Sequence, residues 1–262
     1  MLHVGLASML LCLMTTDGPA LQAVVQTARQ DILADKLRDT VNFDGFDDPK
    51  LTLQDALEYL TDRFDLTFDV DERAFARAGE KRALASEIVK ERPIPKMRGV
   101  SLDGVLDKIL SRLPASSEAT YLIQRRGIVI TTKRAASKAV LGDEDLPLPP
   151  LVHRRIENQP LKLALNDIAG LTDTNVVLDE SVAEKAGESV SARFVNAPVD
   201  TAVRILADRY GFTSFRIDNV IYVTSREKAA KLREDIEKEK RPRGRERMPL
   251  ADEKPMKKGE EK

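Results

Sequence analysis

Apolar residues recur at helical spacing in two stretches of the chain that lie 108 residues apart. The shared positions are Leu53, Leu57 and Leu60 in the first stretch and Leu161, Leu165 and Ile168 in the second. The i, i+4, i+7 spacing puts each set on one face of a helix that can pack against a core. The same offset aligns the apolar segments that follow and end in Asp71 and Asp179. The chain therefore contains an internal repeat.

A second amphipathic helix matches at an offset of 97 residues. The matched positions are Leu102 with Val199, Asp103 with Asp200, Leu106 with Val203 and Ile109 with Leu206. Beyond it, the alternating segment IVIT at 128–131 matches IYVT at 221–224. The change of offset means that the first copy carries 11 extra residues in its middle connection, within 72–95.

Each copy predicts the element order β-α-β-β-α-β-β. Strands are expected near 41–43, 66–70 and 94–97 in the first copy and near 152–156, 176–178 and 190–195 in the second, with a closing hairpin in each. Local signals support this order: Thr52 with Asp55 resembles a capping box, Pro160 suits a first helical residue, Gly211 suits a helix end, and Asp218 with Asn219 suits a tight turn. We expect an α+β fold of two tandem modules, each with two helices packed on a small sheet.

Composition divides the rest of the chain. We predict a signal peptide at 1–23, an N-terminal helix at 24–40, the first module at 41–135, a linker at 136–150, the second module at 151–226 and a charged tail at 227–262. The linker is rich in acidic residues and proline, and the tail lacks the apolar content to fold, so we expect it to be largely disordered. The whole chain has 42 Lys and Arg against 43 Asp and Glu, so its net charge selects for no acidic or basic partner.

The first 23 residues predict export. Their apolar run from Val4 to Met14 is shorter than the roughly 18 residues that a membrane-spanning helix needs. It fits the core of a secretory signal, and Leu21-Gln22-Ala23 resembles a cleavage site. Cys12 is the only cysteine and follows Leu11, which does not fit the lipoprotein signal. We therefore expect a periplasmic protein that is not an integral membrane protein.

One set of residues in the second copy forms a family pattern. These are Pro160, Leu161 and Leu165 at a helix start, Asp179 after a strand, Asn196 and Pro198 before the next helix, and Ile221 and Val223 in the final hairpin. The pattern resembles the secretin and TonB N-terminus short domain, and the first copy fits with Gly99 to Leu102 in place of the Asn-x-Pro start. The resemblance spans about 180 residues and implies a periplasmic recognition domain that contacts other envelope proteins. No barrel-forming region follows, so we do not expect a channel.

The side chains that catalysis needs are scarce. His3 and His153 are the two histidines, too few for a histidine metal site, and no catalytic motif or phosphate-binding loop occurs. Asp71 and Asp179 stand at equivalent positions, but each follows a strand, where a carboxylate satisfies turn amides. We expect no enzyme activity, no catalytic residues, no metal and no cofactor.

The last hairpin supplies the candidate partner-binding site. Its residues are Phe215, Val220, Tyr222 and Val223, and if the final strand is an edge it can accept a partner strand. In that case Val223→Pro should abolish binding and retain the fold. The basic segment 238–247 is a second candidate contact, to an anionic surface or polymer. It has no aromatic residues for base stacking, which argues against nucleic acid.

Two functions remain open on these observations. The first is a cell-envelope scaffold, adaptor or secretion-system accessory that binds unidentified envelope proteins through its tandem modules. The second is a protein that binds a small ligand or a cell-wall polymer in the groove between the two copies.

Overall fold

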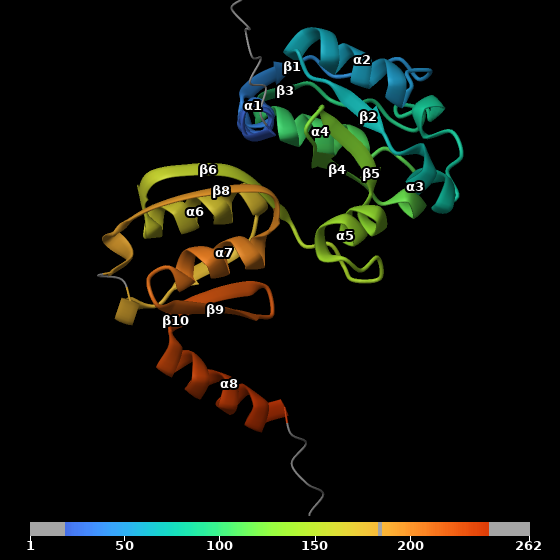
Figure 1. The fold of residues 1–262 in the computed structure, drawn as a ribbon. Coiled ribbons are helices and arrows are strands. Elements are labelled where there is room, and N and C mark those ends of the chain that lie inside the picture. Colours follow the sequence, from blue (N-terminus) through green and yellow to red (C-terminus); the bar gives the residue numbers. More distant parts are fainter. Residues whose placement is uncertain (1–18, 183–184, 241–262) are drawn as a thin grey trace, which may run out of the picture.

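The computed structural model describes residues 19–182 and 185–240. Its buried hydrophobic residues form two clusters, one within residues 33–130 and the other within residues 152–223. Each cluster belongs to one copy of the repeat, and the two copies stack one above the other (Figure 1). We call the copies module 1 and module 2.

Module 1 follows an N-terminal helix, α1 (Pro19–Arg38). Its elements are β1 (Thr40–Phe43), α2 (Leu53–Phe64), β2 (Phe68–Val70), α3 (Glu72–Arg77), β3 (Met97–Ser101), α4 (Leu102–Leu110), β4 (Ala119–Ile123), β5 (Ile128–Thr132) and α5 (Lys133–Leu141), with short 3₁₀ helices at Ala83–Ala85 and Ala115–Ser117. The predicted capping box is confirmed, because the Thr52 hydroxyl accepts from the Asp55 N–H at 3.2 Å and Asp55 Oδ2 accepts from the Thr52 N–H at 2.9 Å. The longer connection of this copy, between Asp71 and β3, contains α3 and the first 3₁₀ helix.

Module 2 has the same order without the extra helix. Its elements are β6 (Leu151–Pro160), α6 (Leu161–Thr172), β7 (Asn175–Leu178), β8 (Ser189–Pro198), α7 (Val199–Asp208), β9 (Phe212–Ile217), β10 (Val220–Ser225) and α8 (Arg226–Lys240), with 3₁₀ helices at Glu180–Val182 and Lys185–Gly187. The hairpin turn has Asp218 at a φ of 51°, as expected, and Gly211 has a φ of 73° three residues beyond α7. The predicted element order is confirmed in both copies.

Each module has two sheets instead of the one we expected. A two-stranded antiparallel sheet, β1–β3 or β6–β8, lies on one side of the helices. A three-stranded sheet, in the order β2-β5-β4 or β7-β10-β9, lies on the other side (Figure 1). The buried residues of α7 are Val199, Ala202, Val203, Leu206 and Ala207. They form a broad apolar face, which lets one helix contact strands of both sheets.

The same carboxylate anchors the three-stranded sheet in each module. The Asp71 N–H donates to the Ile130 carbonyl and Asp71 Oδ2 accepts from the Thr131 hydroxyl at 3.3 Å. In module 2 the Asp179 N–H donates to Val223, and the Asp179 carboxylate accepts from Thr224. Both carboxylates also accept from a turn N–H, of Ala74 or Ser181. The interpretation that these aspartates satisfy turn amides is therefore supported.

Several predicted boundaries differ from the structure. Helix α5 continues to Leu141 with Ala136 fully buried, so the segment without helix or strand between the modules begins only at Gly142. Helix α1 begins at Pro19 and passes the predicted cleavage site at Ala23, whereas the rest of the predicted signal peptide lies outside the described residues. Pro160 precedes α6 as its N-cap instead of being its first residue. The first fourteen residues of the predicted tail, 227–240, belong to α8, which begins at Arg226, and residues 241–262 lie outside the described part.

Two sets of polar contacts join the modules within the described residues. On α1, Asp31 is nearly buried and forms ion pairs with Arg193 at 2.5 Å and with Arg155 at 3.8 Å. On β8, the Asn196 amide donates to the Ile123 carbonyl at 2.8 Å and accepts from the Ile123 N–H at 2.9 Å. Asn196 thus bonds the edge of β4 as a neighbouring strand would, and its φ of 52° is one that Asn tolerates.

Candidate functional site

The strand that we predicted as an open edge lies at the centre of its sheet. Strand β10 pairs in parallel with β7 and antiparallel with β9. Val223 pairs with Leu178 on one side and with Ser214 on the other, and its side chain is fully buried. The prediction of an edge at β10 is therefore wrong. Alternation identified the strand, but it carries no information on the parallel pairing with β7, which comes from a distant part of the chain.

The other three predicted residues gather on the outward face of this sheet. Val220 and Tyr222 alternate with the buried residues of β10, and Phe215 lies opposite Tyr222 on β9. The rings of Phe215 and Tyr222 contact edge to face at 5.9 Å between centroids. Helix α8 covers part of this face, with the Arg233 guanidinium 5.3 Å from the centre of the Phe215 ring.

Strand β7 is an edge of this sheet, and it continues the apolar row. Val177 pairs with Tyr222 and is 45% exposed, and β7 carries no charged side chain. The corresponding edge of module 1 is β2, where Asp69 stands in place of Val177. The Asp69 carboxylate accepts from the N–H of Val70 at 2.9 Å. A charged residue blunts an edge strand, so the two edges differ in how readily they can pair with another strand.

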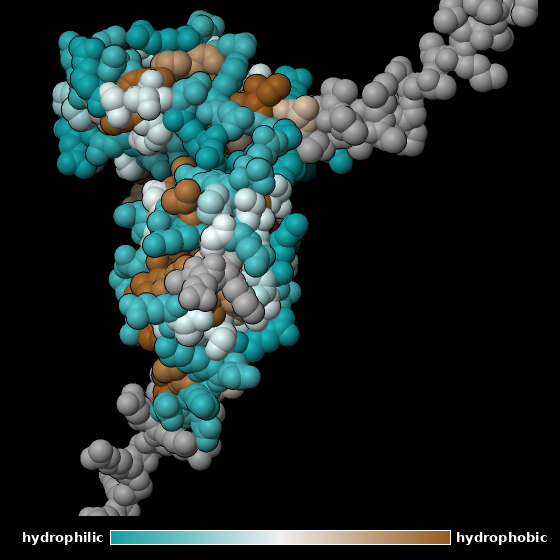
Figure 2. Space-filling view, turned by 90° about the vertical axis from the view of Figure 1, so that its left-hand side faces the viewer, coloured by the Kyte–Doolittle hydropathy of each residue, from teal (hydrophilic) through white to brown (hydrophobic). Residues whose placement is uncertain are grey.

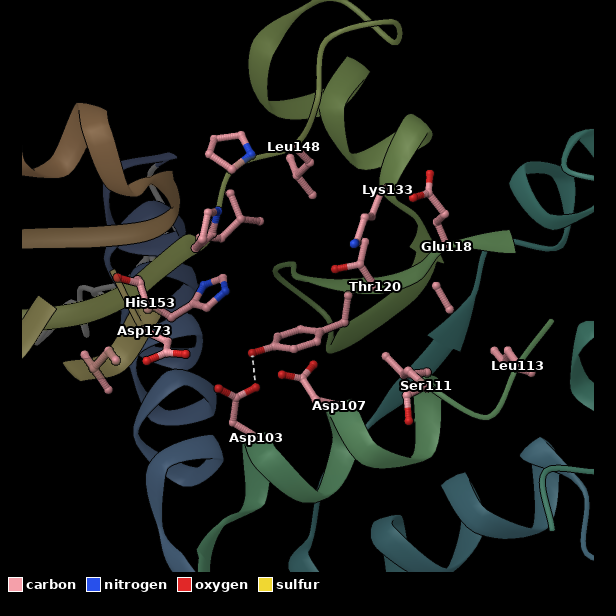
Figure 3. A pocket seen from close by; sticks show the side chains of 18 of the residues that line it. Asp103, Asp107, Ser111, Leu113, Glu118, Thr120, Lys133, Leu148, His153 and Asp173 are labelled. Atoms are coloured by element: carbon pink, nitrogen blue, oxygen red, sulfur yellow. Dashed lines mark hydrogen bonds between the residues drawn. The ribbon is translucent and has the colours of Figure 1, made fainter. Parts of the chain in front are cut away.

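A cleft of about 640 Å³ opens between the modules. Asp103 and Asp107 point into it from α4, and Lys133 points into it from the start of α5 (Figure 3). His153 on β6 and Asp173 at the end of α6 lie on the module 2 side (Figure 3). The rest of the lining is largely apolar and includes Leu110, Leu113, Pro114, Leu148, Leu151 and Leu171. The size is ordinary for a small-molecule site, and the cleft lies where we expected a groove.

The two aspartates of α4 differ in their partners. Asp103 accepts from the Tyr121 hydroxyl at 2.6 Å, whereas the Asp107 carboxylate has no hydrogen bond or ion pair with any residue that the structure describes. Burial raises the pKa of both carboxyls, and the charge of Asp103 helps to raise that of Asp107, to about 6. Burial also raises the pKa of Tyr121 well above its ordinary value, so Tyr121 stays a hydrogen-bond donor.

His153, which Arg154 and Arg155 follow in the sequence, lines the cleft. Its ring stacks on Tyr121 at 5.6 Å between centroids, and its Nδ1 accepts from the Asn196 N–H at 3.1 Å. Burial lowers the pKa of His153 to about 4, so the imidazole is neutral near pH 7. Because Nδ1 is the acceptor, the proton lies on Nε2. No acceptor for the Nε2–H occurs among the residues that the structure describes.

Sequence reasoning missed the cleft residues of module 1. Asp103 and Asp107 are one turn apart on an amphipathic helix, where charged residues normally face solvent. The repeat held a usable signal, because the residues at the matching positions are Asp200 and Arg204. Because the two copies share a fold but have Asp107 in one and Arg204 in the other, the fold does not require a particular residue type at this position.

The comparisons with known proteins add no relative. No family model matches the chain, and no curated protein matches it. Within residues 19–182 and 185–240, no three metal-ligating side chains gather, and no helix is long and apolar enough to cross a membrane.

Proposed function

We propose that the chain is an exported, non-catalytic interaction protein of the cell envelope, a scaffold or adaptor that binds another protein through module 2. The observation that carries this proposal is the open edge at β7. Its exposed Val177 continues an apolar row with Tyr222 and Phe215, and the matching edge of module 1 carries Asp69 instead.

The occupant of this edge is an extended segment of a partner protein, about four residues long. It adds to β7 through backbone hydrogen bonds, which supply affinity, and places an uncharged side chain beside Val177, which supplies selectivity. Hydrophobic surface reaches solvent in module 2 between hydrophilic residues (Figure 2), and Val177 is among its exposed large apolar side chains. The resemblance to a family of periplasmic recognition domains supports the same role.

Site-specific crosslinking tests the occupant. A photoreactive amino acid at position 177 of the full chain, expressed in its native cells, should crosslink to an envelope protein at one short segment. The same probe at Ile205, an exposed residue of α7, is the control and should not crosslink to that segment. A synthetic peptide of the segment should then bind the purified chain.

The matched pair of edges sharpens this test. Val177→Asp gives β7 the residue of β2 and should weaken peptide binding at least tenfold, while Asp69→Val in module 1 should leave it unchanged. The proposal is overturned if position 177 crosslinks only to a second copy of the chain, or if Val177→Asp binds the peptide as tightly as the unchanged protein. Mass spectrometry of the mature N-terminus tests export separately.

A further inference from the structure

The large hydrophobic side chains that are exposed in the described part of the chain lie mostly in module 2. Those of module 2 are Leu163, Leu171, Val177 and Ile205. The offsets of the repeat match them, in this order, with four charged residues of module 1, Asp55, Arg63, Asp69 and Lys108. The shared fold is therefore stable with charged residues at these positions, and it does not explain why module 2 exposes apolar ones.

Two of these residues share the exposed face of helix α6. Leu163 is 52% exposed and Leu171 is 38% exposed, and the exposed Asn166 and Gly170 lie between them. Spacings of three, seven and eight residues from Leu163 put all four on one side of the helix. The matched side of α2 in module 1 is charged throughout, with Asp55, Glu58, Asp62 and Arg63.

Gly170 is a second sign that something approaches α6 closely. Nothing in the described chain lies within 4 Å of a Cβ placed at this position, so the packing of the module does not require glycine there. Glycine in a helix is less favourable than alanine by up to about 1 kcal/mol. What glycine provides in return is a backbone that another chain can approach closely.

The charges at the two ends of α6 fit a second copy of the same helix. Lys162 in the first turn and Asp173 just after the last are exposed and form no ion pair within the described residues. Both oppose the helix dipole, which favours acidic residues at the first turn and basic residues at the last. They lie about 16 Å apart along the axis, too far to meet within one chain. The other charge on this side, Asp167, is paired with Arg154 of its own module at 2.7 Å.

We propose that the chain forms a twofold dimer in which α6 packs antiparallel against α6 of a second copy. This arrangement brings Lys162 of each copy beside Asp173 of the other, where the dipole of the partner helix favours both charges. Leu163 of each copy lies over Gly170 of the other. Asn166 lies near the twofold axis, where the two side-chain amides can bond to each other.

Helix α2 of module 1 cannot pair with itself in this way. Glu58 stands at the position of Asn166, so two glutamates would meet at the axis, and Asp62 stands at the position of Gly170. The dimer therefore belongs to module 2.

Sedimentation of the full chain at rising concentration tests the proposal. One helix of 12 residues from each copy makes a small interface, so the mass should rise from monomer to dimer in the micromolar range. Leu163→Asp gives α6 the residue of α2, and Lys162→Glu reverses the charge at one end. Each should weaken the dimer at least tenfold. Val177→Asp and Ile205→Lys change exposed apolar residues elsewhere on module 2 and should leave it unchanged.

Disulfide crosslinking tests the antiparallel geometry, with Cys12→Ser in every chain to remove the native cysteine. Asn166→Cys lies at the axis and should give a covalent dimer under mild oxidation, whereas Glu58→Cys, the matched position in module 1, should not. Thermal unfolding checks that each variant is folded. The proposal is overturned if the unchanged chain stays monomeric at about 500 µM, if Leu163→Asp dimerises as tightly as the unchanged chain, if Val177→Asp abolishes the dimer, or if Glu58→Cys crosslinks as fast as Asn166→Cys.

Discussion

Module 1 and module 2 share one backbone plan and differ at their surfaces. The two modules agree where a side chain holds the fold, as Asp71 with Thr131 and Asp179 with Thr224 do in their three-stranded sheets. They even share a helix after the last strand, α5 or α8, with a buried alanine in its first turn. The repeat therefore extends beyond the β-α-β-β-α-β-β unit that we predicted.

The modules diverge at two exposed places. On the edge of the three-stranded sheet, module 1 has Asp69 and module 2 has Val177, so the open edge belongs to module 2. On the second helix, module 1 has Asp107 and module 2 has Arg204, so the unpaired carboxylate belongs to module 1. Duplication allows this division, because one copy can lose a surface property that the other keeps.

The largest effect that we expect comes from Val223→Pro. Proline removes an N–H from the central strand of module 2 and cannot be accommodated there, so the variant should lose about 3 kcal/mol or more. Module 2 should unfold while module 1 stays folded, which backbone NMR spectra of the full chain would show module by module. Val223→Thr keeps the N–H and the branched shape and should stay folded. A fully folded Val223→Pro variant would contradict the central position of β10.

Asp179→Asn should cause a smaller loss in the free energy of unfolding than Val223→Pro. The Lys228 ammonium, 2.8 Å away, and the Thr224 hydroxyl hold the pKa of Asp179 well below its ordinary value. A lowered pKa stabilises the fold above the pKa of the unfolded chain, and this stabilisation is lost as the pH falls below about 4. Denaturant unfolding should therefore show a loss in the free energy of unfolding of about 2 kcal/mol at pH 7 and a somewhat smaller loss at pH 3, because the folded carboxyl is still ionised at that pH.

Asp71→Asn is the matched variant in module 1. In module 1 the position of Lys228 is occupied by Ala135, so Asp71 has no lysine partner there. The loss in the free energy of unfolding at pH 7 should therefore be less than half of that for Asp179→Asn. Equal losses in the two modules would show that the ion pair with Lys228 adds nothing to the shared hydrogen bonds.

Asn196→Gly tests the junction between the modules. Glycine retains the positive φ and is the residue that module 1 has at the matching position, Gly99, but it removes both hydrogen bonds to Ile123. We expect a loss of about 1.5 kcal/mol and two separate thermal transitions in place of one. Gly99→Asn is the control: nothing lies within 4 Å of the added Cβ and Asn tolerates the φ of 62° better than most residues, so it should change the transition much less than Asn196→Gly does. A single transition in Asn196→Gly would mean that the remaining contacts, the Asp31 ion pairs and the stacking of His153 on Tyr121, are enough to couple the modules.

The parts that the sequence predicted share a physical cause. Helical and alternating periodicity reports which side of an element is buried, so it identified the helices, strands and caps, including the Thr52 capping box. It does not report which strands become neighbours. The central place of β10 and the division into two sheets depend on pairings between distant segments, such as Val223 with Leu178, and these were missed.

The residues that line the cleft could not be predicted from the sequence for a related reason. Asp107 becomes special only because Leu148 and His153 of the linker and module 2 close over the same space as α4. On an isolated helix the charge of Asp107 is fully solvated, so the sequence of that helix alone does not predict a cleft. The repeat shows that position 107 differs from position 204, but only the folded chain shows what surrounds it.

The smallest effect that we expect is a gain in stability instead of a loss, and it comes from Asp107→Asn. The pKa of Asp107 is raised from 3.8 to about 6 by burial and by the charge of Asp103, so the folded chain binds the proton more tightly than the unfolded chain. The free energy of unfolding therefore falls as the pH rises from about 4 to 6. Asp107→Asn removes this loss and should stabilise the protein by roughly 1 kcal/mol at pH 7.5, after allowance for the solvent that reaches the carboxyl, and by nothing at pH 4.

Asp200→Asn, at the matched position of Asp103, gives the contrast. It removes the partner of Arg216 and should destabilise module 2 at pH 7.5, so the same change of residue type has opposite signs in the two modules. Urea unfolding of both variants at the two pH values measures this difference. Destabilisation by Asp107→Asn at pH 7.5 would place Asp107 among the residues that hold the fold.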